Sequence, residues 1–208
     1  MNTEEKHLFL DDLSASFEES WKLLFDAANN RKSPMHTLAV ATISQDGGPS
    51  QRIMVLRDTN KNSRALRFHT DSRALKTSEV AQQNLASILA YHSDAKVQLR
   101  LKGTARIETD TEDCEAAWQE ASLYGKRCYL ADPAPGTEVD HPTSGLDPDM
   151  EGRKPDIDDV IPARENFAIM LIEVEHIEWL YLAHTGHRRA LFSWDANQKL
   201  WDKKWLVP

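Results

Sequence analysis

The chain carries the sequence QRIMVLR at residues 51–57 and, after a polar loop, ALRFHTDSRALK at residues 65–76. Both runs are typical of β-strands, because apolar residues alternate with polar ones, and both end in cationic or hydroxyl side chains. Guanidinium forks, an ammonium group and short hydroxyl donors beside a chain reversal are the groups that bind a phosphate dianion. The two runs therefore predict a phosphate-ester site that draws on Arg52, Arg57, Arg67, Thr70, Ser72, Arg73 and Lys76.

These arginines also have a simpler interpretation, because arginines alternating with apolar residues on a strand often form only the solvated face of a barrel. The whole chain has 33 acidic and 25 basic residues and a formal net charge of -8, so a local gathering of cations is unusual in it. A nucleic-acid-binding face normally needs a dominant basic patch. The composition therefore argues against a nucleic-acid partner.

The length of 208 residues predicts a single domain over residues 1–208. No apolar run approaches the roughly 20 residues that span a bilayer, so we expect no membrane association. The first residues lack a basic start followed by an apolar core, and we expect a cytoplasmic protein. Cys114 and Cys128 have neither CxxC spacing nor a nearby histidine pair, so we expect reduced thiols and no metal site.

The periodicity of the remaining chain predicts a mainly β protein with few helices. Residues 13–30 form a predicted amphipathic helix, capped by Ser14 or Ser16, within an N-terminal helical extension over residues 1–33. Residues 132–162 carry six of the nine prolines and predict a long acidic, proline-rich loop that is partly mobile. Further helices are predicted at residues 72–83 and 110–129, and strands at residues 37–44, 50–57, 65–70, 85–92, 97–108, 166–174, 177–183, 188–194 and 200–208, with a bulge or bend at Gly103. Together they indicate a small antiparallel β-barrel with peripheral helices.

Several short motifs now follow one another in a recognisable order. RIMVLR and HTDSR are followed by QLRLKG at residues 98–103, RENFA at 164–168, WLYL at 179–182, GHRRA at 186–190 and WLVP at 205–208. This pattern covers nearly the whole chain and resembles the pyridoxamine 5'-phosphate oxidase family, in its less characterised branch of oxidase-related FMN-binding proteins. The resemblance implies an FMN-binding split barrel and a homodimer with FMN between the two subunits.

The resemblance also implies a role for individual residues. The strand Arg52, Ile53, Met54, Val55, Leu56 and Arg57 would lie along the flavin, His69 and Thr70 would match an aromatic-threonine pair, and Ser72 and Arg73 would bind the FMN phosphate. Ala74 stands where the family has a phosphate-binding lysine, and Lys76 is the nearest substitute. Gln98, Trp179 and Arg189 would complete the cofactor site.

The substrate side of the pattern departs further from the oxidase. Arg57 replaces a lysine, and Thr185 replaces a substrate phosphate-binding arginine. Arg57 and His187 are the candidate catalytic residues, and the candidate substrate-binding residues are Tyr124, Arg127 and His187. His187 could equally be an ordinary residue of a hairpin turn.

The resemblance implies an FMN-dependent oxidoreductase in which the flavin carries out a two-electron oxidation of a small substrate, such as a phosphorylated amine or alcohol. The alternative is an FMN-binding protein without pyridoxamine phosphate oxidase turnover, acting as a flavin carrier or sensor. A barrel that has lost its cofactor is a third alternative, which the persistence of the predicted cofactor residues disfavours.

Overall fold

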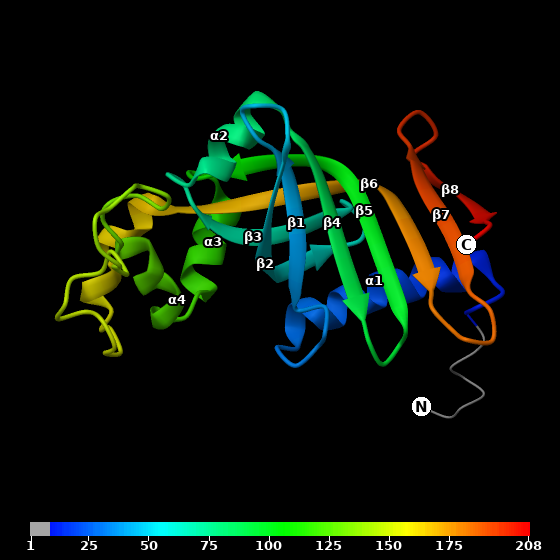
Figure 1. Cartoon of the computed structure of the whole chain (residues 1–208), viewed down its shortest axis with the longest axis horizontal. Helices are drawn as coiled ribbons and strands as arrows, with labels where there is room; N and C mark the ends of the chain where they lie inside the picture. The colour runs from blue at the N-terminus through cyan, green and yellow to red at the C-terminus, as the bar shows by residue number, and fades with distance from the viewer. Residues whose placement is uncertain (1–8) are drawn as a thin grey trace.

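The structure, a computed structural model, describes residues 9–208, so the first eight residues of the expected N-terminal extension lie outside the described part. Eight strands form one antiparallel sheet in the order β3-β2-β1-β4-β5-β6-β7-β8, and β3 also pairs with β6. This extra pairing closes β1 to β6 into a barrel, from which β7 and β8 extend (Figure 1). The expected antiparallel barrel is thus confirmed. The strands are β1 (Thr37–Ile43), β2 (Pro49–Asn60), β3 (Ala65–Asp71), β4 (Leu85–His92), β5 (Val97–Glu108), β6 (Phe167–Tyr181), β7 (Arg188–Asp195) and β8 (Leu200–Leu206).

Strand β6 joins the two parts of the sheet and runs across most of the molecule in Figure 1. The polar residues Glu175 and His176 suggested a break between two strands, but the structure has one continuous strand of 15 residues. Its first half pairs with β3 and β5, and its second half pairs with β5 and β7. The prediction of two strands was wrong because a change of neighbours along one strand cannot be read from its own hydrophobic pattern.

Gly103 marks a bulge in β5, as predicted, because the register of β5 against β6 shifts between Lys102 and Gly103. A Cβ at this position would lie 1.9 Å from the carbonyl oxygen of Glu173. Only glycine permits this approach of the two backbones. The bulge therefore depends on the missing side chain.

Helix α1 (Leu13–Asn29) lies against β2 and the strands β6 to β8, and it buries an apolar stripe that includes Phe17, Trp21 and Leu24. Its cap is Asp12, whose carboxylate accepts from the backbone N–H of Ala15 at 2.7 Å, and not Ser14 or Ser16. Helix α2 (Leu75–Gln82) starts three residues later than predicted. It lies across one end of the barrel (Figure 1).

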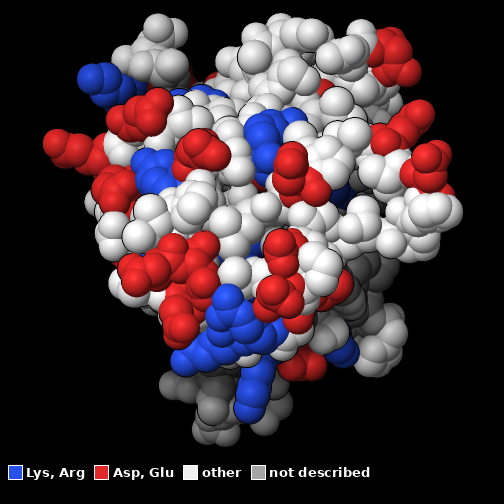
Figure 2. Space-filling view, turned by 90° about the vertical axis from the view of Figure 1, so that its left-hand side faces the viewer, with Lys and Arg blue, Asp and Glu red and all other residues white. Residues whose placement is uncertain are grey.

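The predicted helix at residues 110–129 is divided into α3 (Glu112–Glu120), α4 (Leu123–Arg127) and the 3-10 turn η2 (Cys128–Leu130). The break occurs because the Ser122 side chain accepts from the backbone N–H of Gly125 at 3.2 Å and starts a new helix. These helices cover the β6 end that lies far from β7 and β8 (Figure 1). Figure 2 shows this face, on which basic side chains are mostly interspersed with acidic ones.

The segment at residues 132–162 is long and irregular, and Arg127 holds it by donating to the carbonyl oxygens of Met150, at 3.2 Å, and of Arg153. Arg73 donates to the carbonyl oxygen of Ala131, directly before the segment, at 2.8 Å. Two 3-10 turns, η3 (Asp158–Val160) and η4 (Pro162–Asn166), then lead into β6. No helix within residues 9–208 has the length and apolar character needed to cross a membrane.

Candidate functional site

A cleft of about 330 Å³ lies between the outer side of β2, the end of β3 and the start of α2. Eight of the predicted cofactor residues line it, namely Arg52, Ile53, Met54, Val55, Arg57, His69, Thr70 and Lys76. Leu56 is fully buried in the core instead, and Ser72 and Arg73 lie beside the cleft without lining it. The structure therefore brings nine residues of the runs 51–57 and 65–76 together around one cleft.

Arg52 is fixed at the edge of this cleft by a buried carboxylate. Its guanidinium donates to Glu79 Oε2 at 2.8 Å and to the Ser50 hydroxyl at 2.7 Å. It also donates to Thr42, which in turn donates to Glu79. Burial disfavours the charged Glu79, but the hydrogen bonds from Thr42, Ser50 and Arg52 outweigh it and lower the pKa of this carboxyl group. Glu79 is therefore ionised and holds one rotamer of Arg52.

Lys76 stands one helical turn before Glu79 and presents a second cation to the cleft. Its ammonium donates to Thr70 Oγ1 at 3.1 Å. Burial, and then the neighbouring Arg52, lower the pKa of Lys76. A phosphate dianion in the cleft would relieve both effects, because it supplies the missing opposite charge.

Arg73 makes a different set of contacts from those expected of a free phosphate ligand. Its Nε and Nη2 atoms donate to the two carboxylate oxygens of Asp71 at 3.0 and 2.8 Å, and Nη2 also donates to Ala131. The Asp71 side chain is buried. The structure thus commits Arg73 to an internal ion pair that also ties the segment after η2 to the cleft.

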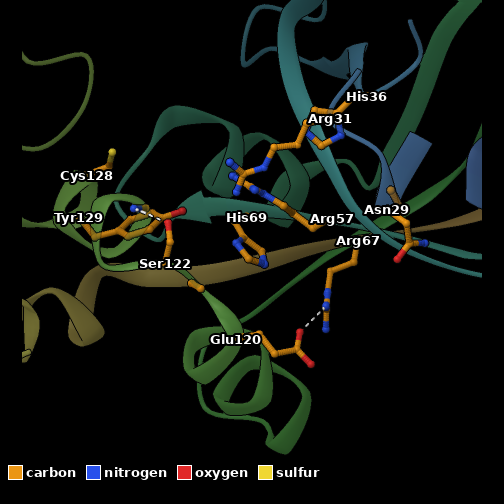
Figure 3. A pocket seen from close by; sticks show the side chains of 13 residues that line it. Asn29, Arg31, His36, Arg57, Arg67, His69, Glu120, Ser122, Cys128 and Tyr129 are labelled. Atoms are coloured by element: carbon orange, nitrogen blue, oxygen red, sulfur yellow. Dashed lines mark hydrogen bonds and ion pairs between the residues drawn. The ribbon is translucent and has the colours of Figure 1, made fainter. Parts of the chain in front are cut away.

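His69 lies on the outer face of β3 and lines the cleft between the cations Arg57 and Arg67 (Figure 3). Burial, then Arg57 and Arg67, lower the pKa of His69 to about 3. Its buried Nε2 atom has no hydrogen-bond partner within residues 9–208. The ring is therefore neutral at physiological pH and has an unused polar atom.

This depressed pKa predicts a pH-dependent loss of stability. The unfolded chain takes up a proton on His69 below about pH 6.5, whereas the folded protein does not until about pH 3, so falling pH favours unfolding. At pH 5, this linkage costs about 2 kcal/mol relative to pH 7. Urea unfolding should show that His69→Gln loses less stability than the parent protein between pH 7 and pH 5. Equal losses in the two proteins would contradict a neutral buried His69.

Gln98 and Arg189 lie on another part of the sheet. Leu180 pairs with Gln98 on one side and with Arg189 on the other, so the three side chains share the outer face of β5, β6 and β7. Arg189 pairs with Glu178 at 3.0 Å. With strands about 4.8 Å apart, β5 and β7 are each three strand spacings, or about 14 Å, from β2 by the shorter way round the barrel. Leu180 also lies seven residues along β6 from Glu173, the last residue that pairs with β3, which adds about 23 Å along the strand. Neither residue lines the cleft.

Trp179 does not share the surface of Gln98 and Arg189, because neighbouring strand residues face opposite sides of the sheet. Its ring is fully buried, with Phe9 at 6.2 Å and Trp205 at 6.4 Å between ring centroids. Trp179 thus packs in the core of its own chain, whereas the resemblance placed it at the cofactor. The ring is not exposed to the cleft.

The predicted substrate residues lie outside the cleft as well. Arg127 extends to the carbonyl oxygens of Met150 and Arg153, and Tyr124 is half exposed beside it. His187 occupies the turn between β6 and β7, where its Nδ1 accepts from the backbone N–H of Ala183 at 3.1 Å. That contact is the one expected of a hairpin-turn residue.

Several residues of the site have no strong sequence signal. Glu79 could have been noticed from its spacing of three after Lys76 on a predicted helix, and Asp71 from its place in HTDSR. No sequence pattern marks Tyr129, which only the fold brings to the cleft. Its burial raises the pKa of the phenol. Cys114 is buried and Cys128 is exposed at the cleft, both as free thiols. No group of three metal-ligating side chains occurs in residues 9–208.

The barrel and the cleft define a class of protein, an antiparallel split barrel with a cationic cleft beside β2 whose side chains suit a small anionic ligand. Comparison with known proteins narrows this class. Residues 18–109 match the family model described as "Pyridoxamine 5'-phosphate oxidase, FMN-binding domain". A relative from Arabidopsis thaliana, named pyridoxine/pyridoxamine 5'-phosphate oxidase 2, is 29% identical over 205 residues, which cover 90% of this chain and 96% of the relative.

Two solved structures share the fold. A pyridoxamine 5'-phosphate oxidase-related, FMN-binding protein from Nostoc punctiforme has a TM-score of 0.73 at 23% identity, over 92% of this chain and 97% of its own. PhzG from Burkholderia lata, solved with tetrahydrophenazine-1-carboxylic acid, has a TM-score of 0.67 at 18% identity, over 100% and 98% of the two chains. Residues 18–109 thus carry the FMN-binding domain of the pyridoxamine 5'-phosphate oxidase family, and the chain as a whole has the split-barrel fold of an FMN-binding protein related to that oxidase. FMN is therefore its cofactor, as the motifs predicted.

Proposed function

We propose that the protein is an FMN-dependent oxidoreductase, resembling pyridoxamine 5'-phosphate oxidase, that oxidises a small phosphorylated amine or alcohol. The observation that carries this proposal is the cleft in which Arg52, Arg57 and Lys76 face one hollow in an otherwise acidic protein. Its volume of about 330 Å³ falls within the roughly 300–1,000 Å³ of small-molecule sites. When bound, FMN supplies the two-electron redox chemistry.

The residues present fit FMN by the chemistry of their donors. Lys76, Thr70 and the oriented Arg52 are suited to the phosphate, while Ile53 and Val55 offer an apolar strip on the outer face of β2 for the ring. Arg73 and Ser72 support this region from behind, through Asp71 and the backbone of Asn166. A cation near the ring, such as Arg57, favours the negative charge that a flavin gains on reduction.

We further propose a homodimer in which each FMN contacts both subunits. Gln98 and Arg189 are too far along the sheet to reach the cleft of their own chain, so they would serve the cleft of a second copy. The surface between them and β2 exposes large apolar side chains, with Ile53 67%, Leu89 46% and Tyr91 47% exposed. Such a face suits a two-fold contact between identical single-domain chains spanning residues 1–208.

A second candidate is an FMN-binding protein that does not turn over pyridoxamine phosphate. The observation that favours it is the engagement of Arg127 with main-chain carbonyls, together with the absence of Tyr124 and His187 from the residues that line the cleft. The expected oxidase substrate contacts are thus not in place within the described chain. This candidate binds FMN as the proposed oxidoreductase does, and differs from it only in not oxidising pyridoxamine phosphate.

Anaerobic titration of the FMN-loaded protein distinguishes the two candidates. Pyridoxamine 5'-phosphate and pyridoxine 5'-phosphate should each bleach the oxidised flavin absorbance if the protein is the proposed oxidase. A yellow protein that neither compound bleaches would be the FMN-binding alternative. A protein that cannot be loaded with FMN would contradict both.

A further inference from the structure

The strands β5, β6 and β7, which lie side by side in Figure 1, carry a cluster of three charged side chains on their outer face. Arg100 of β5 lies directly opposite Glu178 of β6. Arg189 of β7 lies opposite Leu180, two residues further along β6. Long side chains reach both direct and diagonal neighbours on one face of a sheet. Glu178 therefore lies between two arginines that come from separate strands.

Glu178 contacts each arginine with a different carboxylate oxygen. Arg100 Nη1 donates to Glu178 Oε1 at 3.0 Å, and Arg189 Nη2 forms an ion pair with Glu178 Oε2 at 3.0 Å. The side chains of Glu178 and Arg189 are 18% and 29% exposed, so water screens this pair less than it screens a fully exposed one. Two simultaneous contacts hold the carboxylate in one orientation, and the carboxylate in turn holds the guanidinium of Arg189.

Arg189 keeps donors that Glu178 does not use. A guanidinium has five N–H donors, and Glu178 is the one ion-pair partner of Arg189 within residues 9–208. The Nε atom of Arg189 is buried without a hydrogen-bond partner in that part of the chain. Lys204 of β8, on the same face, pairs with Asp202 at 3.5 Å and leaves Glu178 to the two arginines. An oriented arginine with unused donors is suited to an acceptor that approaches the sheet from outside the chain.

We infer that Glu178 is a positioning residue, which fixes Arg189 in the orientation that serves the FMN of the second subunit. The inference rests on the homodimer of the proposed function for that ligand, whereas the cluster itself rests on contacts within one chain. The charge of the cluster supports the inference as well. Without a carboxylate, two arginines would face the cationic cleft of the second subunit, and like charges oppose association. Glu178 leaves one net positive charge in the cluster, because it balances one of the two guanidiniums.

A double-variant cycle on FMN affinity tests the inference. Glu178→Gln should weaken FMN binding about 10-fold, because Arg189 loses its fixed orientation. Arg189→Gln should weaken FMN binding further, and adding Glu178→Gln to Arg189→Gln should change the affinity by no more than about 2-fold. Flavin fluorescence titration measures the affinities, and urea unfolding of each apoprotein measures its stability.

Glu173→Gln is the matched control. Glu173 is also a glutamate of β6 that pairs with an arginine, Arg64, but it lies on the half of the strand that pairs with β3. This variant should bind FMN as the parent protein does. Glu178→Asp keeps the charge of the cluster, but its shorter side chain cannot contact both arginines. It should lose affinity only where Arg189 is present, and it takes the place of Glu178→Gln in the cycle if that variant does not fold.

Each failure has its own signature. If Arg189→Gln binds FMN as tightly as the parent protein, both the proposed two-subunit cofactor site and the inference fail. If Arg189→Gln loses affinity but Glu178→Gln does not, the two-subunit site stands and the inference is overturned. Losses that multiply in the double variant would show a general effect on the fold, and recovery of the parent affinity in it would show an effect of net charge alone. Either result would overturn the inference.

Discussion

Replacing Arg52 with methionine should weaken FMN binding about 100-fold and also lower the free energy of unfolding by about 2–3 kcal/mol. The first effect follows from the loss of a pre-oriented cation at the cofactor cleft. The second follows from Glu79, whose carboxylate is only 7% exposed and loses its ionic partner. A buried unpaired charge is more costly than the lost contact alone. Fluorescence titration with FMN and urea unfolding of the apoprotein measure the two effects separately.

A double variant separates these two roles of Arg52. In Arg52→Met with Glu79→Met, no unpaired carboxylate remains, so most of the stability should return. FMN affinity should not return, because the cation is still missing. Recovery of both properties would show that Arg52 acts only through the stability of the fold.

Arg106→Met provides a matched surface control for Arg52→Met. Arg106 also forms an ion pair with a glutamate, Glu108, at 2.8 Å, but its side chain is 52% exposed. Exposed pairs contribute at most about 1 kcal/mol, so this variant should be nearly as stable as the parent and should bind FMN normally. A loss of FMN affinity in Arg106→Met would mean that net charge, rather than the position of Arg52, controls cofactor binding.

The sequence predicted the barrel well because its strands carry local signals. Alternation of apolar and polar residues identified β2, β4 and β5. The glycine at residue 103 identified the bulge in β5. The closing pair β3 with β6 joins residues about a hundred positions apart and has no local signal. The same limit explains why β6 was predicted as two strands. Pairing partners are a property of the folded chain and not of the strand sequence.

The candidate site was predictable where it lies on one local run and not where distant segments meet. RIMVLR and HTDSR brought most of the cleft residues together, as expected. Arg73 was expected to bind a phosphate, but in the structure it pairs with the buried Asp71. Residue spacing does not reveal this pairing, because it depends on how the side chains pack in the folded protein. Tyr129 belongs to a turn without any motif, and only the fold brings it to the cleft.

The second large effect concerns the apolar outer face of the sheet. Replacing Leu89 with lysine should convert the proposed dimer into a monomer and weaken FMN binding at least about 100-fold. Leu89 is 46% exposed and sits directly between Ala39 of β1 and Arg100 of β5. An ammonium placed there would be buried against the second subunit, and its neighbour Arg100 already takes up the nearest carboxylate, Glu178, at 3.0 Å. The desolvation of an unpaired charge opposes association.

The loss of FMN affinity in this variant follows from the separation of the two sets of cofactor residues. In a monomer, the cleft keeps Arg52, Lys76 and Thr70 but loses the Gln98 and Arg189 that a second copy would supply. For the same reason, diluting the parent protein below its dimer dissociation constant should release FMN, because ligand binding and assembly are linked. Light scattering after gel filtration measures the mass, and flavin fluorescence measures the release.

Leu200→Lys is the matched control for Leu89→Lys, because Leu200 is also a half-exposed strand leucine, 48% exposed, but lies on β8 away from the proposed contact. It introduces the same charge and should remain a dimer with normal FMN affinity. If the parent protein is a monomer that retains bound flavin, then Gln98 and Arg189 have no part in the cofactor site. If Leu89→Lys is a dimer that binds FMN tightly, the two-fold contact lies elsewhere on the barrel.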